Sequence, residues 1–388
     1  MAATPVDWGT TAGLLARRRP APWRHLDIAL AGAALAVAGL GALMVFSATR
    51  GGLEAAGEDP RSYLERQLLF VVVGCVVAAV TTLVDYRTVR NVALLVYAGV
   101  LVLLVGVLSP LGTEVNGSQS WFAIGPFQLQ PAEFGKVAVI VVVAAFCAAS
   151  AGDLRLRRLL VAMVLVGIPV GLILLQPDVG SALVYAALVM GMLLVAGARL
   201  RHIVVVTLLG ALVVVGAFSA GLVELEEYQR DRFSAFLDAD SVDQQGAGYT
   251  QEQSKRAIGN GGITGRGLLE GSQTRLGFVP EQQTDFIFTV VGEELGFVGS
   301  ATLLLLYAIM AWRIWHAARV ASDAFGTLIC AGVLSLLIFQ VFQSVGMATG
   351  IMPVTGIPLP LLSYGGSSLL TMAVAIGLVL NVHMRRYS

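Results

Sequence analysis

The stretch VPEQQTDFIFTVVGEELGFVG, residues 279–299, is the point where a polar segment meets an apolar run. The polar segment extends from Glu224 to Phe286, and strongly apolar runs lie on both sides of it. This pattern places Asp285 at the edge of a membrane-spanning helix, with Glu293 and Glu294 about two turns deeper. Carboxylates at that depth need water, basic partners or protons. Asp285 is therefore the first candidate for a functional residue.

The whole composition favours a membrane protein, because 56% of the residues are hydrophobic and only 13% are charged. A membrane span needs roughly 20 apolar residues. The sequence predicts an all-α integral membrane protein with ten transmembrane helices, in one domain (26–388) that follows an N-terminal tail (1–25). The predicted spans cover residues 26–47, 67–84, 91–111, 134–149, 159–175, 180–197, 203–223, 287–312, 325–345 and 367–382.

The arginines predict how the chain is oriented. They gather in alternate connections and near both ends of the chain, and basic residues of short loops stay in the cytoplasm. We therefore expect both termini in the cytoplasm and a long extracytoplasmic loop, 224–286, between helices 7 and 8. A formal net charge of zero argues against a nucleic-acid partner.

The segment 116–136 leads into the fourth predicted span and holds Glu133 and Lys136 three residues apart. Residues at this spacing share one helix face and can form an ion pair. Ionisable groups at membrane depth normally mark a cavity or a pathway. The alternative is an ion pair that only fixes the start of the helix. Trp121 fits an interfacial anchor better than a substrate platform.

A second polar turn, QPDVGS (176–181), joins two predicted spans. Pro177 ends the first helix, and Asp178 is placed to accept hydrogen bonds from the free amides of the next. Capping alone would explain this aspartate. It is equally compatible with a residue that lines a cavity, and the two roles do not exclude each other.

The long loop offers weaker signals. A glycine-rich run, 259–267, allows close backbone approach to a ligand, and Arg266 within it can meet a phosphate, although a flexible turn explains the residues as well. Nucleotide-binding patterns are missing, so no nucleotide is expected. For Asp285 the alternative is a helix N-cap with a salt bridge. Residues 346–366 are uncharged, apolar and rich in Gly and Pro, which predicts a re-entrant element buried in protein.

Three blocks resemble the signature motifs of the SEDS family of bacterial cell-wall proteins, named for shape, elongation, division and sporulation. They are QPDVGSALVY (176–185), residues 257–299 and GIMPVTGIPLPLLSYGGSS (350–368). The resemblance covers nearly the whole chain. PEQQTDF and the lack of long tails resemble the elongation branch most, with the division branch second.

The resemblance implies a peptidoglycan glycosyltransferase that polymerises lipid II and extends a lipid-linked glycan outside the membrane. It also implies a class B penicillin-binding protein as partner and a location in the bacterial plasma membrane. The family's essential acid in the DFIF motif matches Asp285, its QPD carboxylate matches Asp178, and its PAExxK pattern matches Glu133 and Lys136. We further assign substrate contacts to Glu293 and to Ser363, which lies in the third block.

For this substrate class, a carboxylate near the membrane surface can act as the general base. Asp285 would accept the proton of the acceptor hydroxyl, which attacks the anomeric carbon of the donor. The charge of the departing diphosphate would be met by Lys136, with Arg266 and Arg275 as weaker candidates, or by a divalent cation such as Mg²⁺ or Mn²⁺. No organic cofactor is expected.

Two other functions remain open at this point. A transporter that moves the lipid-linked precursor across the membrane would also place polar residues inside a ten-span bundle. A catalytically silent scaffold for the penicillin-binding protein is the third possibility. The candidate acids gather at one predicted face and match the family motifs, which favours surface chemistry over both.

Overall fold

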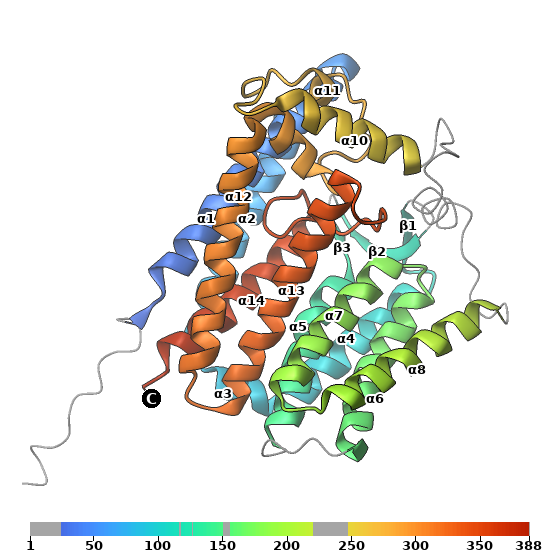
Figure 1. The fold of residues 1–388 in the computed structure, drawn as a ribbon, viewed down its shortest axis with the longest axis vertical. Helices are drawn as coiled ribbons and strands as arrows, with labels where there is room; N and C mark the ends of the chain where they lie inside the picture. The colour runs from blue at the N-terminus through green and yellow to red at the C-terminus, as the bar shows by residue number, and fades with distance from the viewer. Residues whose placement is uncertain (1–24, 116–117, 126, 150–155, 220–246, 388) are drawn as a thin grey trace, which may run out of the picture.

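The computed structural model describes residues 25–115, 118–125, 127–149, 156–219 and 247–387. The predicted tail, apart from His25, lies outside these ranges, and so do residues 220–246 of the predicted loop. Long helices stand side by side, and α10 (Ala247–Gly261) and α11 (Ser272–Arg275) lie at one end of the bundle (Figure 1). The other helices are α1 (Ile28–Ala56), α2 (Ser62–Leu83), α3 (Tyr86–Asn91), α4 (Ala93–Val107), α5 (Pro131–Ala148), α6 (Leu156–Leu174), α7 (Val179–Val195), α8 (Leu200–Ser219), α12 (Ile287–Val320), α13 (Ala324–Thr349) and α14 (Gly366–Met384).

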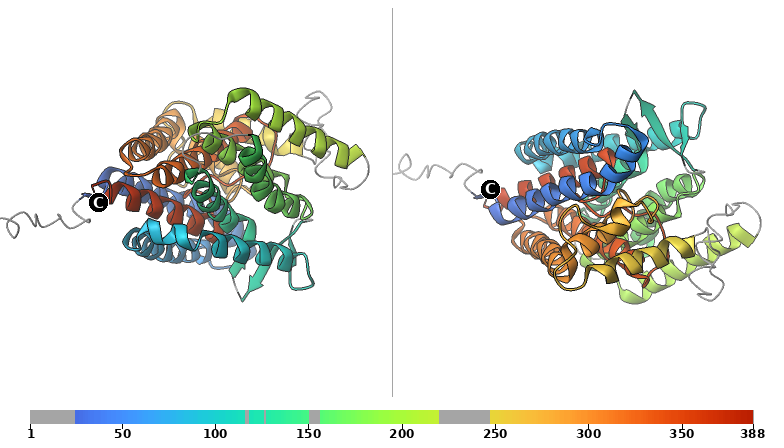
Figure 2. Two further views of the ribbon diagram at one scale, coloured as in Figure 1. Left: turned by 90° about the horizontal axis from the view of Figure 1, so that it is seen from below. Right: turned by 90° about the horizontal axis from the view of Figure 1, so that it is seen from above.

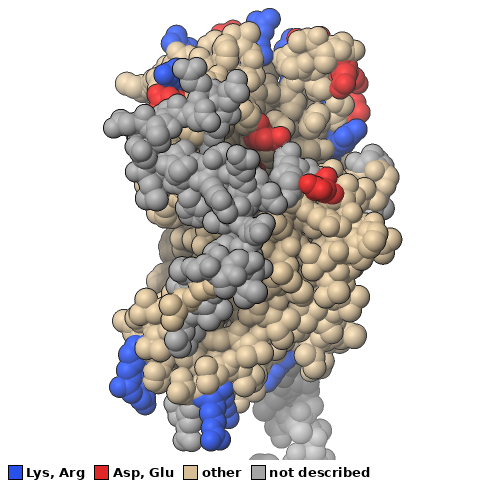
Figure 3. Space-filling model, turned by 90° about the vertical axis from the view of Figure 1, so that its right-hand side faces the viewer, with Lys and Arg blue, Asp and Glu red and all other residues tan. Residues whose placement is uncertain are grey.

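Length and composition identify the membrane-spanning helices. Among the described residues, seven helices are long and apolar enough to cross a membrane: α1, α2, α5, α6, α12, α13 and α14. The shorter helices α4 and α7 are apolar too. On the face drawn in Figure 3, charged side chains gather at the two ends and the middle is uncharged. The chain is thus a mostly helical, multi-pass membrane protein, and every predicted span overlaps a helix.

The helices divide into an inner and an outer group. In the most apolar stretch of each helix, the buried share is 83% for α14 and 72% for α5, against 17% for α2 and 28% for α6. The helix α14 packs against α2, α5 and α13, and Figure 2 shows it among its neighbours in views along the bundle. The outer helices present their apolar side chains to lipid, as a helix apolar on all sides requires.

The expectation of a purely α-helical protein is wrong for one segment. Between α4 and α5 the chain forms a three-stranded antiparallel sheet in the order β1 (Thr113–Val115), β2 (Ser118–Ile124), β3 (Phe127–Leu129). Gly125 adopts a positive φ of 59° after β2, a conformation that favours glycine. The strands are too short to be distinguished from a loop in the sequence, but they bring polar residues toward the bundle.

The helix α12 is broken at Gly296, where φ is 63° and ψ is −159°. The glycine-rich run fits against this break, because Phe297 N donates to Gly262 O at 2.9 Å and Val298 N donates to Ile263 O at 3.0 Å. A side chain at Gly265 would collide with the backbone of Glu294. The glycines thus allow two backbone segments to touch. The predicted uninterrupted span 287–312 is corrected accordingly.

Between α13 and α14 the chain is irregular from residue 350 to residue 365. Ile357, Leu359 and Leu362 of this loop are at most 2% exposed, so the loop packs inside the protein. Tyr364 N donates to Gln283 O at 2.9 Å, which ties the loop to the turn that holds Asp285.

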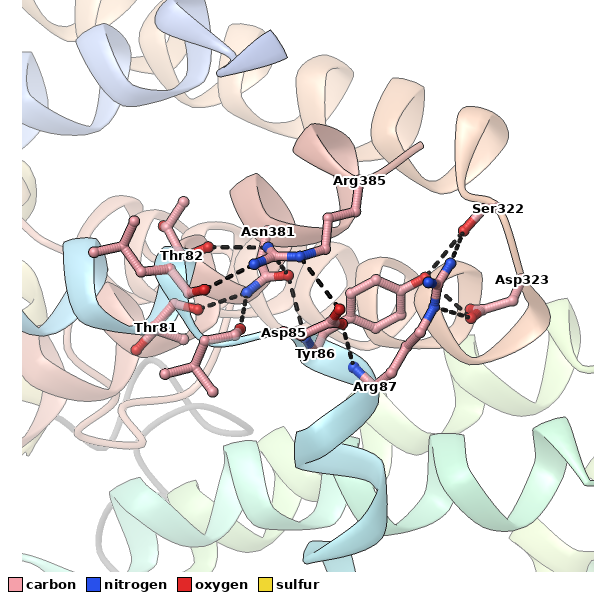
Figure 4. A network of polar contacts seen from close by, with 11 residues as sticks. Thr81, Thr82, Asp85, Tyr86, Arg87, Ser322, Asp323, Asn381 and Arg385 are labelled. Atoms are coloured by element: carbon pink, nitrogen blue, oxygen red, sulfur yellow. Dashed lines mark hydrogen bonds and ion pairs between the residues drawn. The ribbon is translucent and has the colours of Figure 1, made fainter. Parts of the chain in front are cut away.

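A network of polar contacts holds the end of the bundle that lies opposite α10 and α11 (Figure 4). Asn381 of α14 donates through Nδ2 to Thr81 O at 2.7 Å and accepts from Tyr86 N at 3.2 Å. Arg385 donates to Asn381 Oδ1 at 2.6 Å, and Tyr86 donates to Asp323 Oδ2 at 3.0 Å. The network joins the end of α14 to the connection between α2 and α3 and to the start of α13.

Candidate active site

A cavity of about 610 Å³ opens near the end of the bundle that carries α10 and α11. Its wall comes from α2, the sheet, the starts of α5, α7 and α14, the turn before α12 and the loop 350–365. Its charged and amide-bearing lining residues are Arg66, Gln128, Gln130, Glu133, Lys136, Asp178, Glu281 and Asp285. Four of the residues predicted from sequence, Glu133, Lys136, Asp178 and Asp285, therefore meet at one cavity.

Glu133 and Lys136 form the predicted ion pair at the start of α5. Lys136 Nζ lies 2.5 Å from Glu133 Oε1, and the two side chains are only 2% and 4% exposed. Pro131 occupies the first turn of the helix, where its missing N–H costs nothing. Both residues also line the cavity. The two predicted alternatives, an ion pair at the helix start and a pair of cavity-lining residues, therefore apply together.

Asp178 likewise fulfils both of its predicted roles. As the N-cap of α7, its carboxylate accepts from Ser181 N at 2.9 Å and from Ser181 Oγ at 2.7 Å. Gln130 Nε2 donates to the second oxygen at 3.1 Å. All three residues line the cavity, so the carboxylate is held rigidly at its wall.

Asp285 lies in the turn 281–286, immediately before α12. Its backbone N donates to Glu281 O at 3.1 Å, and its side chain is partly buried and lines the cavity. The helix begins at Ile287 with Phe286 as N-cap, so the alternative of Asp285 as the helix cap is wrong. The acid is placed by the turn and faces the cavity.

Glu293 does not reach the cavity wall. Its carboxylate accepts from Gln273 N and Thr274 N, both at 2.8 Å, and from Thr274 Oγ1 at 2.7 Å. These contacts hold the start of α11 against α12, and they occupy the oxygens that a substrate would need. Glu293 and the adjacent Glu294 lie in the part of α12 that packs beside α10 and α11, and their depth in the membrane stays a prediction.

Arg266, Arg275 and Ser363 are also absent from the lining of the cavity. Arg266 Nε donates to Asn260 O at 2.8 Å in an exposed position, and Arg275 is exposed on α11. Ser363 is 4% exposed, and its hydroxyl accepts from Leu359 N at 2.9 Å, which fixes the loop. Their assignment to substrate binding is not supported by this geometry.

The carboxylates do not form a metal site on their own. In the part of the chain that the structure describes, no three His, Cys, Asp or Glu side chains gather closely enough to hold a metal ion. Glu133 is engaged by Lys136 and Asp178 by Ser181 and Gln130. A divalent cation would need ligands from the substrate as well.

Comparison with known proteins gives the family. The model of the cell cycle proteins FtsW, RodA and SpoVE matches residues 28–388. The chain belongs to this family. It is the SEDS family that the sequence motifs resemble, and its name covers both RodA, the elongation branch, and FtsW, the division branch. The preference for RodA over FtsW stays a prediction.

Individual relatives match over nearly the full length. A probable peptidoglycan glycosyltransferase FtsW of Trichlorobacter lovleyi is 39% identical, and the match covers 94% of this chain and 95% of the relative. The peptidoglycan glycosyltransferase MrdB of Escherichia coli K12 is 38% identical, with 93% and 94% covered. A structure described as "Structural coordination of polymerization and crosslinking by a peptidoglycan synthase complex" has a TM-score of 0.77 at 32% identity, covering 94% of this chain and 99% of that one.

Sequence analysis of this SEDS protein missed several lining residues. Trp121 of β2 lies in the cavity wall, and its role as an interfacial anchor stays a prediction. Tyr63, Arg66 and Phe70 of α2 also line the cavity, and Tyr364 lies opposite them in the loop. The spacing of three and four residues in α2 was a usable signal, because such residues share one helix face.

Proposed function

We propose that this chain is a peptidoglycan glycosyltransferase that polymerises lipid II into β-1,4-linked glycan strands for cell-wall elongation. The observation that carries the proposal is the convergence of Glu133, Lys136, Asp178 and Asp285 on one cavity of about 610 Å³. These residues come from three separate segments of the chain, with Glu133 and Lys136 together in α5, and each belongs to a motif that resembles the family's. Family membership and relatives that carry this enzyme name support the same activity.

Asp285 is the general base in this proposal. It accepts the proton of the acceptor's GlcNAc 4-hydroxyl as that oxygen attacks the anomeric carbon of the lipid-linked MurNAc. Attack from the face opposite the diphosphate inverts the configuration, from an α-linked donor to a β-linked product. Because undecaprenyl diphosphate is already a good leaving group, one carboxylate is sufficient, unlike the pair used in glycoside hydrolysis.

The rigid groups of the cavity wall position the sugars. Asp178 is held by Ser181 and Gln130, and Glu133 is held by Lys136, so each presents fixed oxygens without further ordering. Preorganised polar groups of this kind stabilise a transition state because they do not reorganise during the reaction. A divalent cation bound partly by the diphosphate stays a prediction, and metal chelation during the polymerisation assay tests it.

The proposed topology has ten spans, both termini in the cytoplasm and the cavity on the extracytoplasmic side of the plasma membrane. On the face drawn in Figure 3, the end away from the cavity displays only Lys and Arg among charged side chains, which the positive-inside rule assigns to the cytoplasm. His25 O lies 3.0 Å from His383 Nδ1, so the start of α1 and the end of α14 share that end.

The proposed partner is a class B penicillin-binding protein, which would cross-link the strands that this chain makes. The matching structure of a peptidoglycan synthase complex, described by its polymerisation and crosslinking, supports such a pairing. Copurification of this chain with a tagged class B penicillin-binding protein tests the partner independently of activity. Recovery of the partner alone would exclude a stable complex.

The experiment that tests the function is lipid II polymerisation by the purified full chain, with and without the partner. Asp285→Asn should lower the rate by about a hundredfold to ten-thousandfold, the usual contribution of a general base, with an unchanged melting temperature. Glu252→Gln is the matched control, because Glu252 is an exposed acid paired with Lys255 on α10. Moenomycin excludes contamination by unrelated glycosyltransferases.

Two outcomes would contradict the proposal in different ways. If Asp285→Asn polymerised lipid II at the wild-type rate, Asp285 would not be the general base, although the chain would still be a glycosyltransferase. A wild-type protein that moves lipid II across vesicle membranes but makes no glycan would favour the transporter.

A further inference from the structure

The charge of Lys136 is already compensated inside the protein. Its ammonium group lies 2.5 Å from the Glu133 carboxylate, and both side chains are almost completely buried. From a ligand's position, such a close pair of opposite charges acts as a dipole and attracts an anion far less than a single cation does. Arg266 and Arg275 lie outside the cavity wall. A ligand with several negative charges therefore needs another positive group in the cavity.

Among the lining residues that the structure describes, Arg66 is such a group. It lies on α2 between Tyr63 and Phe70, at spacings of three and four residues, and all three side chains line the cavity. Within the described ranges, the ion pairs of the protein do not include Arg66. Its side chain instead lies near the Tyr364 hydroxyl, and this proximity partly offsets the rise that burial causes in the pKa of the Tyr364 phenol. The guanidinium thus has a neutral partner and retains its charge.

Tyr364 lies near Arg66 and also contacts the turn 281–286, which carries the proposed base. Burial raises the pKa of the Tyr364 phenol, so this group is uncharged at neutral pH. Its ring packs against Tyr63 with 4.9 Å between centroids, and its backbone N donates to Gln283 O at 2.9 Å. Gln283 is two residues before Asp285. The contacts connect the guanidinium, through Tyr364, to the turn that carries the proposed base.

The first turn of α14 lines the same cavity as Arg66, and the N–H groups of a helix start carry partial positive charge. This 19-residue helix starts without a side-chain cap, and Gly365, Gly366 and Ser368 line the cavity. Phe70 packs directly on Gly366, where an added Cβ would lie 2.5 Å from the ring, so α2 and α14 are fixed together. Free N–H groups at a helix start favour an anion. They add to a site whose main component is Arg66.

We propose that Arg66 binds the diphosphate of the lipid-linked donor, assisted by the first turn of α14. The inference rests on the proposed function and names the diphosphate-binding part of its site. As the bond between the new glycosidic oxygen and the anomeric carbon forms, the bond from that carbon to the diphosphate oxygen breaks. The electron pair leaves with the diphosphate, and the hydroxyl proton goes to Asp285. The planar guanidinium fork matches two phosphate oxygens at once.

Two measurements on the full chain in detergent test this assignment. The first is kcat/KM for lipid II, which should fall about tenfold to a hundredfold in Arg66→Gln, because a charge-assisted contact is lost. Arg66→Lys should recover part of it, since an ammonium keeps the charge and loses the fork. The control is Arg61→Gln, an exposed arginine at the start of α2 that does not line the cavity and should behave as wild type.

The second measurement does not require turnover. Undecaprenyl diphosphate should raise the melting temperature of the wild type and of Asp285→Asn more than undecaprenyl monophosphate does, because a ligand of the folded state stabilises it. Arg66→Gln should lose this preference for the diphosphate. If Arg66→Gln keeps the preference, the inference is wrong, whatever its polymerisation rate. If the wild type shows the preference but makes no glycan, the proposed function fails and the diphosphate site stands.

Discussion

Polar side chains gather around both ends of α14, and the two clusters differ in what they contact. The far end is the C-terminal end, at Asn381 and Arg385, and the near end is the N-terminal end, beside the cavity. At the far end, Asn381 and Arg385 direct their hydrogen bonds to backbone carbonyls and side chains of the protein (Figure 4). At the near end, Arg66, Asp178 and Asp285 line a cavity of about 610 Å³. A cluster whose groups satisfy one another holds helices together, whereas a cluster arranged around a space is available to a ligand.

The Glu133–Lys136 pair combines the two kinds of cluster, and breaking it should have the largest effect on stability. Glu133→Gln leaves the buried Lys136 ammonium without its counter-charge, which costs about 3–5 kcal/mol of the free energy of unfolding. Thermal unfolding in detergent measures the loss. An unchanged melting temperature would show that the pair contributes nothing to the fold.

The double replacement Glu133→Leu with Lys136→Leu separates the two roles. Because apolar residues of similar volume often replace a buried ion pair without loss, the double variant should recover most of the stability. It should still polymerise lipid II poorly, since the cavity wall has lost both polar groups. If the double variant polymerised lipid II at the wild-type rate, the Glu133–Lys136 pair would have a role in stability only and none in the reaction.

The parts of this site that depend on local spacing were predictable from the sequence. Glu133 and Lys136 are three residues apart, and helix geometry alone brings them together. Asp178 follows a proline and precedes an apolar helix, which is enough to predict its capping bonds. The apolar runs predicted the helical membrane fold for the same reason, because each span needs only its own composition.

The remaining parts depend on contacts between distant segments. Arg66 and Tyr364 are nearly 300 residues apart, and their meeting depends on the folded contacts between α2 and the region before α14, such as Tyr63 on Tyr364 and Phe70 on Gly366. Gly296 lies in an apolar run whose sequence predicts one continuous helix. The break at Gly296 depends on the glycine-rich run 259–267, which packs against it. Glu293 was predicted to bind substrate because its partners, two backbone amides of α11, cannot be recognised from composition.

The polar network around Asn381 and Arg385, called the far network here, lies at the C-terminal end of α14 (Figure 4). Replacing Asn381 at its centre should have the second-largest effect on stability. Asn381→Leu removes the acceptor of Tyr86 N, one of the acceptors of Arg385 and the donor to Thr81 O, at a cost of about 2–3 kcal/mol in unfolding free energy. Polymerisation per folded molecule should be unchanged, because the network lies at the end of the bundle away from the cavity. Arg319→Gln, on the exposed end of α12, is the control and should alter stability by less than about 1 kcal/mol. A stable Asn381→Leu protein without activity would contradict the division between the two clusters.

Asp178→Asn gives the smallest expected change in stability and the sharpest test of the comparison. Asparagine caps a helix about as well as aspartate, so the melting temperature should change by an amount equivalent to less than about 0.5 kcal/mol. The side-chain oxygen still accepts from Ser181 N, while the negative charge at the cavity wall disappears. If Asp178 acts on the substrate, polymerisation falls although the helix start is intact. If polymerisation persists, Asp178 is a cap that happens to lie beside the cavity, and it belongs with the structural residues of the far network.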